Sequence, residues 1–221
     1  MNNIRDVGNR LAPFFKSHGF KRKNNKFFKI ENNIALCVGL DRPGGLYSLC
    51  YILPLYIPTN IPHISFGGRL QDFDPFPVHN FTFDWDEPSQ LEVFIERTME
   101  CCEKYFFPLY DSISTPKGLI DFLNKGWSHA RMYFGNLELM FYYELKVYTN
   151  FVLSRYDDML DDIHMLCSAR ESNPHIMPEQ QSYWQEKMDY LIYLSTAPEE
   201  EKEEFIKSTI EHSTIACRFK K

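Results

Sequence analysis

The sequence predicts an α+β protein, in which an N-terminal helix and an antiparallel β-meander with a packed helix are followed by an α-helical C-terminal region. Three changes of pattern predict this class. Apolar residues recur at helical spacing up to residue 17, alternate with small or polar residues from 20 to 58, and return to helical spacing after residue 88. We expect residues 1–113 to form a sheet domain and residues 114–221 a helical region packed on the sheet as one compact unit.

The first helix is predicted over residues 3–17, where the apolar side chains follow a helical period. Gly19 stands just beyond it, at a position where glycine often ends a helix because it adopts the left-handed conformation at little cost. Pro13 lies late for a helix interior, and it predicts a kink or an early end.

A meander of three or four antiparallel strands is predicted next, ending between residues 54 and 58. A further strand is expected near residues 64–66. Asn and Gly tolerate positive φ, so segments rich in them are typical of hairpin turns. Such segments occur at residues 24–25, 32–33 and 42–45.

The rest of the chain is predicted to be helical. Helices are expected over residues 88–107 and 115–126, and a seven-residue apolar rhythm predicts one long helix between residues 137 and 166. Thr196 and Glu199 have the spacing of a capping box, which predicts that the last helix starts there.

Charge is unevenly distributed along the 221 residues. The net charge is −6; residues 1–110 carry 12 basic and 12 acidic side chains, whereas residues 111–221 carry 12 and 18. Eight Lys and Arg side chains lie in residues 1–30. A basic segment can bind nucleic acid, but a short basic hairpin balancing an acidic body is the simpler interpretation. We therefore expect a basic protein partner rather than nucleic acid.

The cysteines and the hydropathy indicate a compartment. None of the six cysteines forms C-x-x-C, and most lie in apolar runs, where free cysteine behaves as a small buried hydrophobe. The sequence shows no signal-peptide pattern and no apolar run long enough to span a bilayer. We expect a reducing cytoplasm and no membrane partner.

The stretch YDDMLDDIHM, residues 156–165, contains D-D-x-x-D, a spacing that holds magnesium and diphosphate in isoprenoid synthases. At about 100° per residue, Asp157 and Asp161 point away from the core, while Asp158 and Asp162 flank the apolar stripe. An exposed pair of carboxylates binds magnesium weakly, and no second acidic motif faces it. A solvated helix face is the favoured interpretation, and a metal site at Asp157 and Asp161 is the alternative.

Motifs for other chemistry give little support to an enzyme. No two of the seven histidines are four residues apart, and G-x-S-x-G, the Walker A motif and a G-x-G-x-x-G after a strand are absent from the sequence. Gly67-Gly68 beside Arg69 could offer amides and a cation to a phosphate, but such a pair is more often a turn. We expect no cofactor and no catalytic residues.

The segment from Gln71 to Glu87 is the most typical of a binding loop. It is long and combines aromatic with acidic residues, and long loops within domains are often functional. Aromatic side chains beside acidic groups suit a basic protein partner. The alternative is that the rings fill the core and the Asp residues cap turns. The predicted partner-binding residues are Asp72, Asp74, Phe76, Asp84, Trp85 and Asp86.

The stretch HGFKRKNNKFF resembles a bacterial domain of unknown function, family 4304 (DUF 4304), in which a motif of the type GFKKKGNTFYR introduces an antiparallel sheet. The resemblance covers the first half of the chain. It implies an α+β, bacterial, cytoplasmic protein, and it supplies no catalytic residues. The matching positions are Gly19, Phe20, Lys21, Lys23, Asn24, Phe27 and Phe28.

Two classes of function fit these patterns. The first is a non-enzymatic protein-binding module, such as an immunity-type inhibitor of a basic toxin, because the second half is acidic and the chain is rich in aromatic residues. The alternative is a metal- or phosphate-dependent enzyme that uses Asp157 and Asp161.

Overall fold

The structure of the chain is a computed structural model that describes residues 4–41, 47–58, 66–69, 88–134, 137–172, 178–217 and 219. The strands are β1 (Lys21–Lys23), β2 (Lys26–Glu31), β3 (Ile34–Asp41), β4 (Tyr47–Pro54) and β5 (Phe66–Arg69). The helices are α1 (Ile4–Ser17), α2 (Pro88–Cys101), the π-helix η2 (Cys102–Phe106), α3 (Phe107–Ile113), α4 (Pro116–Leu123), α5 (Trp127–Phe134), α6 (Leu139–Val152), α7 (Tyr156–Glu171), α8 (Pro178–Thr196) and α9 (Glu199–Ala216). This arrangement confirms the predicted α+β class.

The sheet is antiparallel, and its strand order, β1-β2-β3-β4-β5, follows the chain order. Two of the predicted turns are present, because Asn24, Asn32 and Asn33 take positive φ angles of 54°, 47° and 64°. The β2–β3 and β3–β4 pairings are the longest in the sheet.

The glycine pair Gly67-Gly68 lies within β5, so the turn predicted there is wrong. Gly67 pairs with Tyr51 of β4, and Gly68 pairs with Cys50. A Cβ atom at Gly67 would overlap the backbone of β4. Glycine is required at this position because the two strands approach closely, and not because the chain reverses there.

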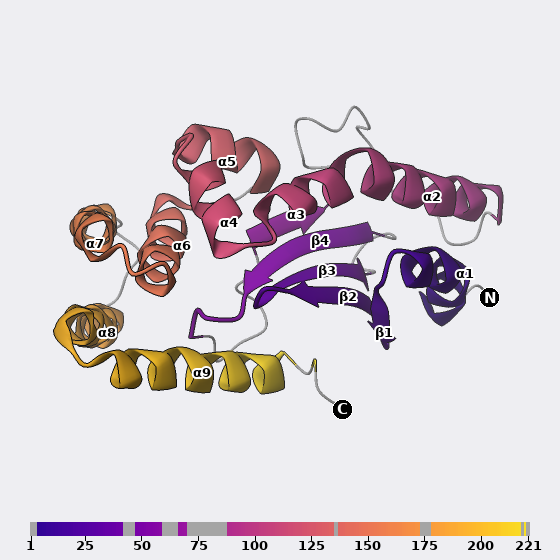
Figure 1. The fold of residues 1–221 in the computed structure, drawn as a ribbon. Helices are drawn as coiled ribbons and strands as arrows, with labels where there is room; N and C mark the ends of the chain where they lie inside the picture. Colours follow the sequence, from indigo (N-terminus) through magenta and orange to yellow (C-terminus); the bar gives the residue numbers. More distant parts are fainter. Residues whose placement is uncertain are drawn as a thin grey trace.

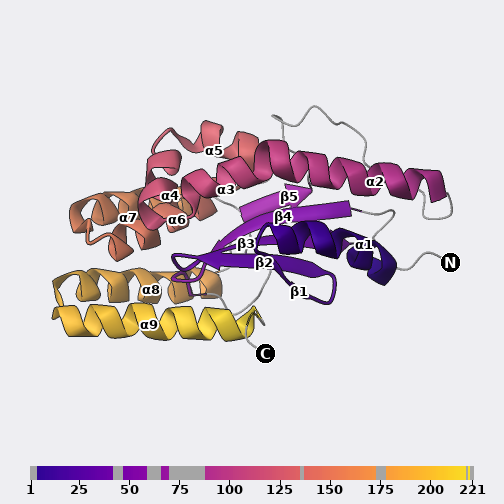
Figure 2. The same ribbon diagram turned by 45° about the vertical axis from the view of Figure 1, so that its right-hand side comes forward.

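Each face of the sheet is covered by helices from different parts of the chain (Figure 1). The large apolar residues of β3, such as Leu36 and Val38, lie in the same core as residues of α1 and α2. The alternate residues Ala35 and Cys37 lie on the opposite face, where the end of α9 and Phe219 pack. The helical second half therefore returns to the sheet, as Figure 2 also shows.

The predicted helix over residues 88–107 continues to residue 113 through a π-helical segment. The N–H of Phe107 donates to the carbonyl of Cys102, five residues earlier. Pro108 follows. It has no N–H to donate, and in a regular α-helix its ring would clash with the carbonyl of the residue four positions earlier. The wider π turn accommodates this proline, and the helix continues into α3 with a change of direction (Figure 2).

The prediction of one long helix between residues 137 and 166 is wrong, because the chain reverses direction at Ser154. This residue takes a φ of 55°, and the N–H of Arg155 donates to the carbonyl of Asn150 at 2.9 Å. Helices α6 and α7 therefore form a hairpin. The apolar rhythm persists through the break because α6 and α7 each bury an apolar face with helical spacing.

The capping box predicted at Thr196 is also wrong. Thr196 is the last residue of α8, and its hydroxyl donates to the carbonyl of Tyr193 at 3.1 Å. Pro198 stands at the N-cap of α9, without a side-chain cap. The carbonyl of Pro198 accepts from the N–H groups of Glu201 at 3.1 Å and Lys202 at 3.4 Å, so α9 begins at Glu199 without the threonine.

The six cysteines are all free, and four of them are buried. Burial raises the pKa of Cys37, Cys50 and Cys101, so these thiols stay protonated at neutral pH. No helix in the described part of the chain has the length and hydropathy needed to cross a membrane.

Candidate functional site

All three carboxylates of the D-D-x-x-D motif, Asp157, Asp158 and Asp161, are exposed, whereas Asp162, which follows the motif, is buried. Asp157 and Asp161 are exposed on the outer side of α7, as the helical geometry predicted. Asp162 is buried, and it accepts hydrogen bonds from Lys146 at 2.6 Å and Asn150 at 2.8 Å. Across the described ranges, no group of three or more His, Cys, Asp or Glu side chains is placed to hold a metal ion.

The predicted binding loop, residues 71–87, lies outside the described residues, so Asp72, Asp74, Phe76, Asp84, Trp85 and Asp86 stay predictions. The side chain of Arg69, proposed for phosphate, is not described either, although its backbone pairs with Leu49 in the sheet. The described residues nevertheless contain a serine, a histidine and a carboxylate in contact, which the sequence did not indicate.

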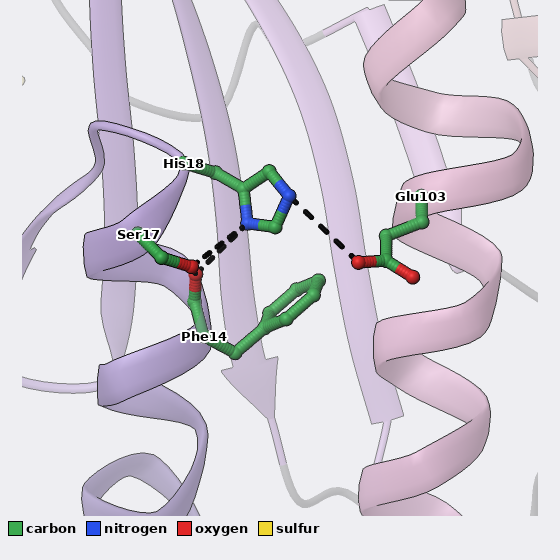
Figure 3. A network of polar contacts seen from close by, with 4 residues as sticks. All are labelled: Phe14, Ser17, His18 and Glu103. Carbon is green, nitrogen blue, oxygen red and sulfur yellow. Dashed lines mark hydrogen bonds and ion pairs between the residues drawn. The ribbon is translucent and has the colours of Figure 1, made fainter.

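Ser17, His18 and Glu103 meet at the C-terminal end of α1 (Figure 3). The Nδ1 atom of His18 lies 2.9 Å from the carbonyl oxygen of Phe14, and Nε2 lies 3.8 Å from Oε1 of Glu103. The hydroxyl of Ser17 donates to the same carbonyl at 2.7 Å. The hydroxyl oxygen of Ser17 also lies 3.3 Å from Nδ1 of His18. Since Nδ1 faces the carbonyl of Phe14, which can only accept, Nδ1 carries a proton and cannot take one from the serine, as a catalytic histidine must. This network therefore caps α1 and ties it to η2.

Glu144 and Arg170 are further charged side chains buried between the helices of the second half. Glu144 of α6 is 2% exposed, and burial raises its pKa to about 7, although the charges of Lys187 and Arg170 oppose the shift. The guanidinium of Arg170 in α7 lies 4.5 Å from the ring centre of Trp184 in α8. These contacts join α6, α7 and α8 around the buried carboxyl group of Glu144.

The outer side of α8 carries two tyrosines among acidic side chains. At about 100° per residue, Glu186, Asp189, Tyr190 and Tyr193 fall on one side of the helix, away from buried Met188. Tyr190 is 49% exposed and Tyr193 is 55% exposed. Their rings are stacked, with centres 6.2 Å apart.

Helix α9 extends this side of the molecule. The hydroxyl of Tyr193 donates to Oε2 of Glu201 at 3.2 Å, and the ring of Tyr190 meets Phe205 edge-on at 5.7 Å. The hydrogen bond to Glu201 raises the pKa of Tyr193. We name this surface the acidic tyrosine face; its residues are Glu186, Asp189, Tyr190, Tyr193, Glu200, Glu201 and Glu204.

The lysine in the first turns of α9 does not neutralise this face. Lys202 is 8% exposed, and its Nζ lies 4.3 Å from the ring centre of Tyr156 and 3.4 Å from Glu199. Glu200, Glu201 and Glu204 are all exposed. The run EEEKEE therefore presents carboxylates outwards and turns its one cation inwards.

The sequence contained part of the signal for this face. The spacing of Glu186, Asp189, Tyr190 and Tyr193 places them together on any helix, and it could have been read directly. The contact with Glu201 could not, because it depends on how α9 folds back along α8 after Pro198.

Comparison of the chain with protein-family models, curated proteins and solved structures finds no match in any of the three. The resemblance to family 4304 therefore stays a prediction. Function must be inferred from the residues of this chain.

Proposed function

We propose that this protein is a protein-binding module whose acidic tyrosine face engages a basic partner protein. One observation carries the proposal: Tyr190 and Tyr193 stand about half exposed in a field of five exposed carboxylates. Tyrosine combines a large apolar ring with a polar end and is enriched among the residues that dominate binding energy.

The two tyrosines are held in place before any partner binds. Tyr190 packs against Phe205, and Tyr193 stacks on Tyr190 while its hydroxyl donates to Glu201. A side chain that is already ordered loses little entropy on association, so more of its contact energy contributes to affinity. This arrangement supports a role as the anchor of an interface.

The carboxylates around the tyrosines supply selectivity. Surface charges of one sign speed the encounter with a partner of the opposite sign and disfavour partners of the same sign. Since Lys202 is turned inwards, the field at the start of α9 is not interrupted. An immunity-type inhibitor of a basic toxin is one class of protein with this chemistry. The proposal extends to the predicted loop, where Asp84, Trp85 and Asp86 would add a second contact.

The test begins with capture of a basic protein from lysate of the source cell by the tagged chain, at low and at high salt. The captured protein is then purified and titrated calorimetrically against variants. Y190A/Y193A is expected to weaken binding by about 100-fold or more, because each anchor contributes about 2 kcal/mol when it is a hot spot. E200Q/E204Q is expected to slow association and to reduce its dependence on salt.

The matched control is D157N/D161N, which removes two exposed carboxylates from α7 and leaves the face intact. Its affinity should stay within about threefold of the wild type, since scattered surface charges contribute little. A third variant, D84A/W85A/D86A, tests the loop separately. Unchanged affinity in Y190A/Y193A, with far-UV circular dichroism showing a native fold, would refute the assignment of the face.

A further inference from the structure

A polar pocket is lined by residues from the start of α1 and from the β1–β2 hairpin. These elements lie at the opposite end of the molecule from α7 and α8 (Figure 1). Its volume is about 660 Å³, within the usual range for small-molecule sites. The described lining residues are Ile4, Arg5, Asn9, Arg22, Asn24 and Asn25. Among these six residues two are arginines, three are asparagines and none is acidic.

Arg22 is fixed in the wall of this pocket by neutral acceptors. Its Nη1 donates to Oδ1 of Asn9 at 2.8 Å, its Nε to the carbonyl of Asn24 at 2.9 Å, and its Nη2 to the carbonyl of Arg5 at 3.3 Å. The guanidinium also lies 5.6 Å from the ring centre of Phe27. A guanidinium has five N–H groups, and among the described residues three of them have acceptors, so the other two are the donors that a ligand would use.

Gly8 makes room for this guanidinium. A Cβ atom at Gly8 would overlap Nη2 and Cζ of Arg22. Glycine in the interior of a helix costs about 1 kcal/mol relative to alanine. Gly8 lets the guanidinium lie directly against α1, where its three hydrogen bonds hold it.

The described lining of the pocket carries two positive charges, Arg5 and Arg22, and no negative one. Burial and the positive charge of Arg5 lower the pKa of Arg22, so the two cations repel each other across a partly desolvated space. The first residues of α1, Ile4 and Arg5, add the positive end of the helix dipole to the same pocket. A bound anion would relieve this repulsion, and a doubly charged anion would relieve it most.

We infer that the pocket binds the phosphate group of a small phosphate ester. The fork of Arg22 suits the oxygens of a phosphate, with Arg5 as the second cation and the amides of Asn9 and Asn24 as further donors. The volume leaves room for an organic part beyond the phosphate. The site lies apart from the acidic tyrosine face and does not rest on the proposed function.

The experiment is calorimetric titration of the full-length protein with three probes: inorganic phosphate, adenosine 5′-monophosphate, and adenosine as the matched compound without a phosphate. Ionic strength is held constant with chloride. Saturable binding of both phosphate probes, with no binding of adenosine, is the expected result. Saturable binding of adenosine, or no binding of either phosphate probe, would overturn the inference.

The decisive variant is Asn9→Asp. It keeps the shape of the side chain and satisfies Nη1 of Arg22, so the fold should be retained, but its carboxylate neutralises the arginine and repels an anion. We expect it to weaken binding of adenosine 5′-monophosphate by at least about tenfold. Arg5→Gln should weaken it similarly.

Lys117→Gln removes an exposed cation in α4, outside the pocket, and serves as the matched control. Its affinity for adenosine 5′-monophosphate should match that of the wild type. Equal affinity in Asn9→Asp and the wild type would overturn the assignment. So would tight binding of a short oligonucleotide in place of the monophosphate.

Discussion

Lys146 of α6 and Asp162 of α7 form an ion pair inside the helical half of the molecule, with Nζ 2.6 Å from Oδ1. The two side chains are 17% and 7% exposed. Burial raises the pKa of Asp162 even though Lys146 and Asn150 act in the opposite direction. Burial thus outweighs both hydrogen-bonding partners at Asp162, and we expect the pair to fix the alignment of the two helices rather than to add net stability.

The first prediction concerns this pair. Asp162→Ala should lower the free energy of unfolding by about 3 kcal/mol, because it leaves the partly buried ammonium group of Lys146 and the buried amide of Asn150 without their acceptor. A double-mutant cycle uses Lys146→Met, Asp162→Leu and the double variant K146M/D162L. The double variant should lose clearly less unfolding free energy than the sum of the losses in the two single variants. Urea unfolding of the four proteins in a double-mutant cycle measures the coupling, and additive effects would contradict the prediction.

The same pair shows what the sequence could predict. The positions of Asp157 and Asp161 on the outer side of α7 follow from helical geometry alone. The partner of Asp162 does not, because Lys146 approaches across a turn at Ser154 that no glycine or proline marks. The sheet was better predicted, since Asn-rich turns and alternating side chains are local signals. On the acidic tyrosine face, the helical spacing was readable and the α8–α9 contact was not.

The second prediction concerns Glu144 and pH. Its pKa is about 7 in the folded protein, against an ordinary value of 4.5, so the folded state retains the proton over this interval while the unfolded state releases it. The contribution of Glu144 to the free energy of unfolding should therefore be greatest below about pH 4.5. This contribution should fall by up to about 3 kcal/mol as the pH rises to 7.

Glu144→Gln should remove this part of the pH dependence. Urea unfolding at several pH values between 4.5 and 7.5, for the wild type and the variant, measures the difference between the two slopes. Glu186→Gln, an exposed change on α8, is the control and should keep the wild-type slope. Parallel curves for the wild type and Glu144→Gln would show that burial does not perturb this carboxyl group.

The third prediction concerns Ser154 between α6 and α7. Its φ of 55° is costly for a residue with a Cβ atom, whereas glycine adopts it freely. Ser154→Gly should raise the free energy of unfolding by up to about 1 kcal/mol, and Ser154→Val should lower it by at least as much. Thermal unfolding measures both, and a lower melting temperature for the glycine variant would contradict the prediction.

The fourth prediction couples Gly8 with Arg22. Helix propensity alone would make Gly8→Ala stabilising by about 1 kcal/mol. When Arg22 is present, we expect Gly8→Ala to give no gain in the free energy of unfolding, because the new methyl group displaces the guanidinium from its three hydrogen bonds. In an Arg22→Ala background the same change should be stabilising. Denaturant unfolding of the wild type, Gly8→Ala, Arg22→Ala and the double variant tests this prediction. An equal effect of Gly8→Ala with and without Arg22 would show that the two residues act independently.

Helix α9 and Phe219 cover the face of the sheet that carries Phe28 and Cys37. During synthesis on the ribosome, the strands emerge long before this cover exists, and a sheet with an uncovered apolar face is prone to associate with other chains. Nascent chains should therefore depend on chaperones until the last helix is free of the exit tunnel. Shortening the chain before residue 210 should cause aggregation rather than yield a smaller stable protein.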